Sequence, residues 1–224
     1  MKSVIMILCL LILIFGCSGL QTVVEKDDMG RVTKRVIYSQ GKPHFVEEIH
    51  YNRNSTNPSI IKYKKLIEQK AVPWREEYFI YENEIIAQIN FFIYIKNQKI
   101  QSGRINYLYS GNKPKRVEYY SILNLVNKKI FRTGLDLYNY SKDNLISRRI
   151  IEYEYNPKTK RVMQISQYVI YLQNKNILKM KIWELDELSK NIFKKEENNL
   201  NIILKKINDI EDVLSKKAKG MRFI

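Results

Sequence analysis

Four residues of the chain carry thiol or imidazole groups: Cys9, Cys17, His44 and His50. The two histidines are six residues apart in a segment that alternates like a strand, so they share one face but lie about 20 Å apart along it. One metal ion cannot bind both. Since no cysteine follows Cys17, the rest of the chain also excludes zinc sites of the usual cysteine type. We expect both histidines to be structural or solvated.

The other polar residues do not form a recognisable catalytic arrangement. The adjacent carboxylates of Glu47-Glu48 and Glu76-Glu77 would point to opposite faces of a strand, which makes them poor acid/base pairs. The sequence has no glycine-rich phosphate loop and no G-x-S-x-G nucleophile motif beside a histidine. We therefore expect a protein that is not an enzyme and that holds no cofactor or metal.

The N-terminal residues have the order of an export signal. Lys2 precedes an apolar run of about twelve residues, too short to span a bilayer, and Gly16-Cys17 follows it. Ile14-Phe15-Gly16-Cys17 resembles the lipobox of bacterial lipoproteins, in a loose form like that of spirochaetes. The resemblance implies that residues 1–16 are removed and that the Cys17 sulfur and the new amino terminus are acylated. The alternative is an ordinary cleaved signal in which Cys17 is incidental.

This resemblance implies a location at the membrane. Each buried methylene contributes about 0.8 kcal/mol, so several acyl chains together anchor a protein stably. Cys9 would be lost with the signal and Cys17 would carry lipid, which leaves no cysteine for a disulfide. The exported part must therefore be stabilised by a hydrophobic core without disulfides, and it is long enough to form one. We expect a lipid-anchored protein of the bacterial cell envelope, at the outer membrane, on its surface or its periplasmic face.

The chain is strongly basic, with 39 Lys and Arg against 23 Asp and Glu and a formal net charge of +16. Such a protein attracts anionic surfaces, such as lipid phosphates or sulfated glycans. Nucleic acid is the other common partner of a basic protein, but export argues against it. The charge could also serve solubility alone.

Three basic turns supply the candidate anion-binding residues. They would form one rim if the fold brought them to the same end of the sheet. The residues are Lys113, Lys115, Arg116, Lys128, Lys129, Arg132, Lys158, Lys160 and Arg161.

Residues 29–184 have the pattern of antiparallel strands joined by short turns, after a polar tether over residues 17–28. Turn residues recur, as in Ser39–Lys42 and Asn156–Lys158, and the intervals leave no room for the helical crossovers of parallel strands. Between the turns, apolar side chains alternate, as in Ile89–Ile95. This pattern predicts a meander of hairpins.

Residues 145–155 are expected to present one solvated face and one inward face. Arg148, Ile150 and Glu152 lie on the first face, where Arg148 could pair with a neighbouring carboxylate. The inward face carries Leu145, Ile151, Tyr153 and Tyr155.

The sequence also contains a weak repeat. Tyr38–Pro43 is echoed by Tyr109–Pro114, and many of the expected strands end in a tyrosine. This style is similar to the YD-type and MORN-like hairpin repeats of bacterial exported proteins, as in Met29–Val32 followed by Tyr38 and Gly41. The resemblance implies a shared hairpin construction.

The spacing of apolar residues changes near Glu184 from the alternation of a strand to the period of a helix. Leu185, Leu188 and Ile192 recur at helical spacing, and so do Leu200, Ile203, Ile207, Ile210 and Leu214. We predict an amphipathic helix over residues 185–220, with a break near Asn198 left open, that packs its apolar stripe on the sheet. A coiled-coil seam and a membrane-surface helix are the alternatives.

The sequence therefore predicts a mainly β protein: a long antiparallel β meander, as a curled sheet or open barrel, capped by a C-terminal helix. Trp74 and Trp183 are expected to anchor the core or a sheet edge rather than to bind a ligand. The expected function is a non-enzymatic binding or structural role of an envelope lipoprotein, which binds a protein or polyanion at the cell surface. The alternative is a periplasmic carrier of a lipid or acyl chain, with an apolar cavity between sheet and helix.

Overall fold

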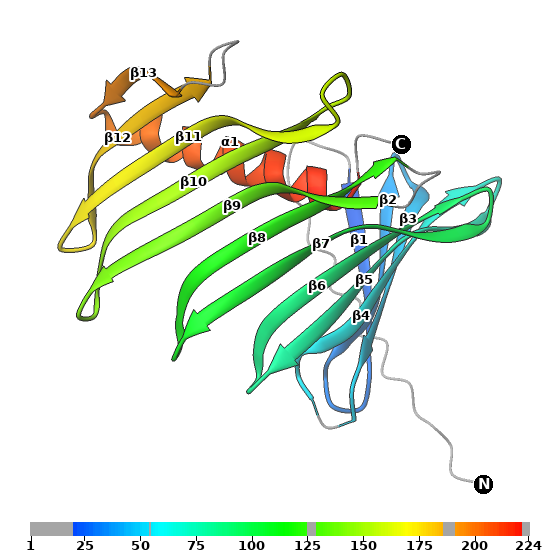
Figure 1. Ribbon diagram of the computed structural model, residues 1–224. Coiled ribbons are helices and arrows are strands. Elements are labelled where there is room, and N and C mark those ends of the chain that lie inside the picture. Colours follow the sequence, from blue (N-terminus) through cyan, green and yellow to red (C-terminus); the bar gives the residue numbers. More distant parts are fainter. Residues whose placement is uncertain (1–19, 54, 125–128, 186–190, 221–224) are drawn as a thin grey trace, which may run out of the picture. The chain divides into compact units, whose positions relative to one another are not determined.

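Figure 1 shows a computed structural model of the chain, which describes residues 20–53, 55–124, 129–185 and 191–220. The predicted signal peptide, Cys17 and Lys128 lie outside the described residues. The elements are β1 (Leu20–Lys26), β2 (Val32–Ser39), β3 (Lys42–Tyr51), β4 (Pro58–Ile67), β5 (Lys70–Glu82), β6 (Ile85–Ile95), β7 (Gln98–Ser110), β8 (Lys113–Asn124), β9 (Lys129–Ser141), β10 (Asn144–Asn156), β11 (Arg161–Gln173), β12 (Asn176–Leu185), β13 (Asn191–Glu197) and α1 (Leu200–Ala218).

The thirteen strands form one antiparallel sheet in which each strand is hydrogen-bonded to the next in the sequence. β1 and β13 are the two edges, so the sheet is not closed. The predicted long meander with a C-terminal helix is confirmed. The described residues divide into two compact units: unit 1 lies within residues 20–80 and 92–99, and unit 2 lies within residues 81–91 and 100–220.

Two-residue turns join many of the strands. Both turn residues have positive φ at Gln40-Gly41, Glu68-Gln69, Asn83-Glu84, Lys96-Asn97 and Asn174-Lys175. This is the type I′ geometry, whose twist matches that of the flanking strands. The turn at Gln40-Gly41 lies within the expected turn Ser39–Lys42, whereas Glu68-Gln69 carries no glycine, proline or asparagine and was not expected.

Strand β1 corrects the prediction of a tether over residues 17–28. It pairs with β2 from Leu20 opposite Ser39 to Lys26 opposite Val32. The turn that follows is fixed by Asp27, whose Oδ1 accepts hydrogen bonds of 3.0 and 2.9 Å from the backbone N–H groups of Met29 and Arg31. The sheet therefore begins before residue 29.

The C-terminal helix also starts later than predicted. Residues 191–197 form strand β13, in which Ile192 lies opposite Glu184 of β12. The helix begins at Leu200 because Asn199 caps it: the Asn199 side chain accepts hydrogen bonds from the backbone N–H groups of Asn201 (3.1 Å) and Ile202 (3.4 Å). The prediction of a helix from residue 185 is wrong for β13, because three apolar residues at helical spacing are too few to exclude a strand.

In unit 2, α1 packs its apolar stripe on one face of the sheet, as predicted (Figure 1). The main cluster contains Ile203, Ile207, Ile210 and Leu214 of α1 with Ile150, Tyr168, Ile170, Met180 and Ile182 of the strands. Gly134 allows the close approach, because a Cβ atom there would lie 2.5 Å from Cδ2 of Leu214. A second cluster joins Ala218 to Phe91, Ile105 and Val117.

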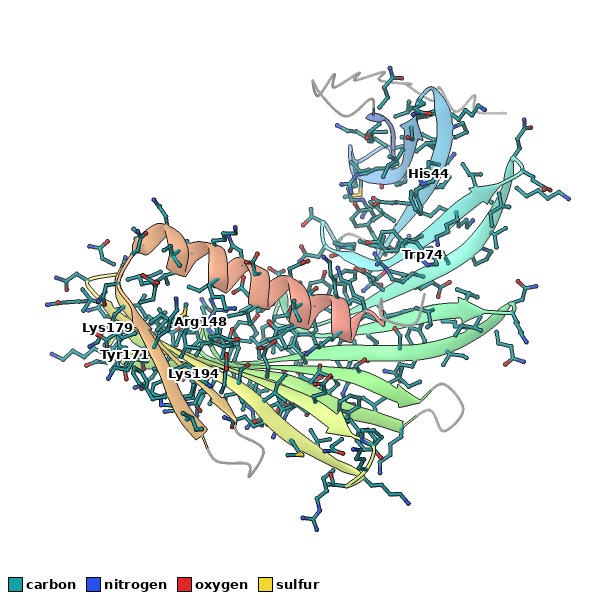
Figure 2. The ribbon with its side chains drawn as sticks, turned by 90° about the horizontal axis from the view of Figure 1, so that it is seen from above. His44, Trp74, Arg148, Tyr171, Lys179 and Lys194 are labelled. Atoms are coloured by element: carbon teal, nitrogen blue, oxygen red, sulfur yellow. The ribbon has the colours of Figure 1, made fainter. Side chains whose placement is uncertain are left out.

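This packing buries the face of residues 145–155 that was expected to be solvated, while Ile151 on the other face is also buried, as expected. Ile150 is fully buried beneath α1. Arg148 shares its face and forms ion pairs with Asp136 of β9 and Glu211 of α1, so the expected carboxylate partner exists (Figure 2). The prediction that this face is solvated is wrong, because the helix covers it.

One row of alternating charges crosses the strands of unit 1. Glu25, Lys34, Glu48, Lys62 and Glu76 lie opposite one another in register from β1 to β5. Signs alternate along this row, and opposite charges on facing residues stabilise a strand pair. The Nζ atom of Lys34 lies 2.8 Å from the Glu25 carboxylate. Glu48 and Glu76 form their ion pairs outside the row, with Lys64 and Lys99.

Candidate anion-binding face

The open face is the surface of β7 to β12 that points away from α1. Val117, Ile150 and Ile182 belong to the clusters that pack against the helix. Side chains alternate along a strand, so the sequence neighbours of these residues point the other way. Figure 2 shows α1 along one side of these strands, which leaves the other side uncovered within unit 2.

One row of cross-strand neighbours on the open face carries a cation on every second strand. In register, the row runs through Leu108, Arg116, Leu137, Arg149, Val169, Lys181 and Glu196. We call Arg116 of β8, Arg149 of β10 and Lys181 of β12 the cationic row. Because neighbouring strands lie about 4.8 Å apart, the backbone positions of successive cations are about 9.6 Å apart.

Glu118 is buried among the cations at one end of this row. It forms ion pairs with Arg116 and, at 3.7 Å, with Arg132, and it accepts a hydrogen bond of 2.9 Å from the Tyr120 hydroxyl. Burial raises the pKa of Glu118, but the hydrogen bond from Tyr120 and the charge of Arg116 outweigh it, and the pKa lies below its usual value. Glu118 therefore stays ionised and fixes the two guanidinium groups on the open face.

Tyrosine rings support the arginines beside Glu118. The guanidinium of Arg104 lies 4.6 Å from the ring centroid of Tyr120, and that of Arg132 lies 4.9 Å from the ring centroid of Tyr153. A cation–π contact with an aromatic face orders a guanidinium, whose N–H groups lie in its own plane and can still donate to a ligand. These arginines are thus positioned before any ligand arrives.

At the other end of the row, two lysines share one carboxylate. Lys179 and Lys181 lie 3.3 and 3.7 Å from Glu196, and both ammonium groups lie within 6 Å of the Tyr171 ring centroid (Figure 2). Between the two ends, Arg149 is exposed and forms no ion pair with any residue that the structure describes. The open face therefore carries more cations than its carboxylates neutralise, and such a surface attracts anions.

The structure divides the predicted basic turns among separate places. Arg116 and Arg132 meet at Glu118 on the open face. Lys113 and Lys115 lie at the β7–β8 hairpin, where Lys113 pairs with Asp143 of the β9–β10 turn. The exposed residues Lys129, Lys158, Lys160 and Arg161 lie at the opposite ends of the strands. The eight of these residues that the structure describes do not form one rim.

Arg104, Arg149, Lys179 and Lys181 were not identified from the sequence. Each lies inside a strand rather than in a turn. The available signal was the alternation along each strand, which assigns a residue to a face but does not align it with residues on other strands.

The other candidate residues are scattered. His44 and His50 lie on the same strand, β3, and the His44 ring packs edge-on against Phe45. The Trp183 ring packs edge-to-face against Phe193 of the edge strand β13, with ring centroids 5.7 Å apart, which agrees with an anchor at a sheet edge. Trp74 packs against Phe45 with its ring 4.4 Å from the Lys65 ammonium.

The described residues offer neither a metal-ion cluster nor a membrane-spanning helix. No group of three or more His, Cys, Asp or Glu side chains in residues 20–53, 55–124, 129–185 and 191–220 could hold a metal ion. Within the same residues, no helix has both the length and the apolar character needed to cross a membrane.

No protein-family model matches the chain, and no curated protein matches it. Among solved structures, a protein of unknown function from Bacteroides fragilis has a TM-score of 0.33 and 6% identity, over 70% of this chain and 93% of its own. A DUF3836 family protein from Bacteroides vulgatus has a TM-score of 0.31 and 16% identity, over 41% and 90%. A TcdB2-TccC3 structure has a TM-score of 0.35 and 10% identity, over 81% of this chain but 14% of its own. With such low TM-scores, none of these likenesses bears on the function of this chain.

Proposed function

We propose that the chain is a lipid-anchored protein of the bacterial cell envelope whose open face binds a polyanion at the cell surface. The lipid would be attached to Cys17, as the resemblance to a lipobox implies. The role is binding rather than catalysis, and the chemistry of the open face favours sulfate, phosphate or carboxylate groups repeated along a polymer.

The cationic row is the observation that carries this proposal. Arg116, Arg149 and Lys181 come from three strands of one sheet, so the backbone fixes their separation. A polymer with anionic groups at comparable separations could contact all three without ordering a loop, which lowers the entropic cost of binding. The net charge of +16 adds long-range attraction.

Binding to heparin, used as a model sulfated glycan, tests the proposal. The full chain in detergent is titrated with heparin at several salt concentrations, and Arg149→Glu/Lys181→Glu is compared with wild type. Hydrogen bonds to charged groups contribute about 1.5–3 kcal/mol, so we expect Kd to rise at least about tenfold for each lost contact. The dependence of log Kd on log salt concentration should become shallower as well.

Lys158→Glu/Lys160→Glu is the matched control, because it changes the net charge equally at an exposed turn away from the cationic row. We expect it to weaken binding only slightly at 0.15 M salt, where the screening length is about 8 Å. If both double variants weaken heparin binding equally, the open face has no special role and the net charge alone explains the attraction.

The anchor is tested separately in bacterial cells that express the chain. A labelled fatty acid should be incorporated into wild type and not into Cys17→Ser. Protease added to intact cells should degrade the protein if the open face is exposed at the cell surface. Protection from protease would place the protein on the periplasmic face and would contradict surface binding.

A periplasmic carrier of a lipid or acyl chain is the second hypothesis, and the size of the cavity counts against a lipid with two acyl chains. A cavity does lie between α1 and the strands β12 and β13, but its volume is about 230 Å³. Pockets that bury a drug-sized ligand hold about 300–1,000 Å³. The cavity is thus too small to enclose a lipid with two acyl chains.

A further inference from the structure

The cavity beneath the start of α1 has an apolar floor. Met180 and Ile203 are fully buried, Ile182 is nearly so, and Tyr168 completes the floor. Ile202 lines the mouth and is half exposed. Because Met180 and Ile182 point toward α1, the cavity lies on the opposite side of the sheet from the open face.

Three lysines line the same cavity. Lys194 lies 3.8 Å from Glu184, and Lys195 lies 3.3 Å from Glu197. Glu197 is further occupied by the backbone N–H groups of residues 198 and 199, which donate to its Oε1. The third lysine, Lys206, has no carboxylate partner among the described residues, and its ammonium lies 5.6 Å from the Tyr168 ring centroid. The mouth therefore carries one uncompensated positive charge.

We propose that this cavity binds a single-chain anionic amphiphile, a fatty acid, with its alkyl end on the apolar floor and its carboxylate at Lys206. An apolar cavity of about 150 Å³ accommodates benzene, with six carbons. By the same ratio, a cavity of about 230 Å³ accommodates roughly eight or nine carbons of one chain. This site goes beyond the proposed binding of a polyanion, because it uses other residues on the other side of the sheet.

Photolabelling tests the site. The full lipidated chain in phosphatidylcholine vesicles is irradiated with a decanoate that carries a diazirine at its alkyl end, and the labelled peptides are mapped by mass spectrometry. We expect the label on β12 and the first turns of α1. Unlabelled octanoate should compete, whereas octylamine of the same length should not. Labels spread evenly over the chain, or equal competition by octylamine, would overturn the proposal.

The dependence on chain length tests the size of the cavity. Each buried methylene contributes about 0.8 kcal/mol, which corresponds to about a fourfold gain in affinity. The free concentration of acid needed for half-maximal competition should therefore fall about 16-fold from hexanoate to octanoate and level off beyond nine or ten carbons. A fall that continues unchanged to tetradecanoate would indicate partition into the vesicle and contradict a cavity of fixed size.

Lys206→Glu and Lys205→Glu form a matched pair, since both residues are exposed on α1 but only Lys206 lines the cavity. We expect labelling to fall about tenfold in Lys206→Glu and to be unchanged in Lys205→Glu. Ile202→Trp, which fills the mouth, should have the same effect, with the exposed Leu204→Trp as its control. Equal labelling within each pair would refute the site. Heparin binding should stay normal in all four variants, so failure here and failure of the open face are distinguishable.

Discussion

Arg148 ties α1 to the sheet through two carboxylates. Its Nε and Nη2 atoms lie 3.0 and 2.6 Å from the carboxylate of Asp136, and Nη2 also pairs with Glu211 of the helix. Asp136 is 1% exposed and accepts a further hydrogen bond of 2.8 Å from the Tyr138 hydroxyl. Replacing Arg148 by methionine retains much of the side-chain packing but leaves a buried carboxylate without its cation.

We expect Arg148→Met to lower the free energy of unfolding by about 3–5 kcal/mol at pH 7, the usual cost of removing one partner of a buried ion pair. Each kcal/mol corresponds to roughly 2–4 °C in Tm for a chain of this size, so Tm should fall by roughly 6–20 °C. Thermal unfolding followed by circular dichroism measures this change. Glu211→Gln should cost less than about 1 kcal/mol, because the Glu211 side chain is 41% exposed and solvent screens its pair.

Arg149 provides the control for Arg148, since it is the next residue but lies exposed on the opposite face. Arg149→Met should change stability by no more than about 0.5 kcal/mol. The double variant Asp136→Leu/Arg148→Met should recover most of the loss, because it removes the buried charge together with its partner. If Arg148→Met costs no more than Arg149→Met, the ion pair does not stabilise the docked helix and the reasoning fails.

The effect of pH gives a second readout on Asp136. Burial raises the pKa of Asp136, and in wild type Arg148 opposes that increase. Without Arg148, the folded-state pKa should lie well above the unfolded value of about 3.9. A group of this kind loses its stabilising contribution as pH rises through the folded pKa. The stability difference between Arg148→Met and wild type should therefore be smaller at pH 5 than at pH 7, and an equal difference at both would contradict the account.

Three further changes test the packing, the ionisation and the capping of unit 2. Gly134→Ala should destabilise by about 1–3 kcal/mol in urea unfolding, because its Cβ would lie 2.5 Å from Leu214. The pKa of Glu118 is lowered in the folded state. Its contribution to the free energy of unfolding is therefore present above its ordinary pKa and is lost as pH falls through the folded value. Glu118→Gln should accordingly reduce the loss of stability between pH 5 and pH 3. Asn199→Ala should cost about 0.5–2 kcal/mol and lower the helix signal in circular dichroism, since it removes the cap of α1.

The meander could be predicted because its signals are local. A turn such as Lys96-Asn97, with polar residues between two alternating apolar runs, indicates a hairpin without reference to the rest of the chain. Glu68-Gln69 adopts the same geometry without a typical turn residue, so the β4–β5 hairpin could not be recognised in this way. β1 was missed for a related reason: its polar residues suggested a tether, and only pairing with β2 makes it a strand.

The choice of the buried face depends on contacts distant in the sequence. In residues 145–155, either set of alternating side chains could face a core. Ile150 is buried because α1, more than fifty residues later in the sequence, covers it. The charge of Arg148 is tolerated beneath the helix because it is neutralised by Asp136 and Glu211. Asp136 precedes Arg148 by 12 residues on the paired strand β9, and Glu211 follows it by 63 residues. The alternation of side chains was therefore identified correctly, but which of the two faces the helix covers could not be inferred from the strand alone.

The cationic row depends on the lengths of whole hairpins. Arg116, Arg149 and Lys181 are separated by 33 and 32 residues. They lie side by side across the sheet only because the strands, turns and bulges between them have lengths that bring the chain back to the same position along the strand direction. A shift of one residue in any of these strands would move its cation to the face that α1 covers, where it would be buried without a partner. A binding surface built in this way tolerates changes of side chain better than insertions. A single residue inserted within β9 or β11 should thus weaken heparin binding more than any single substitution in the row.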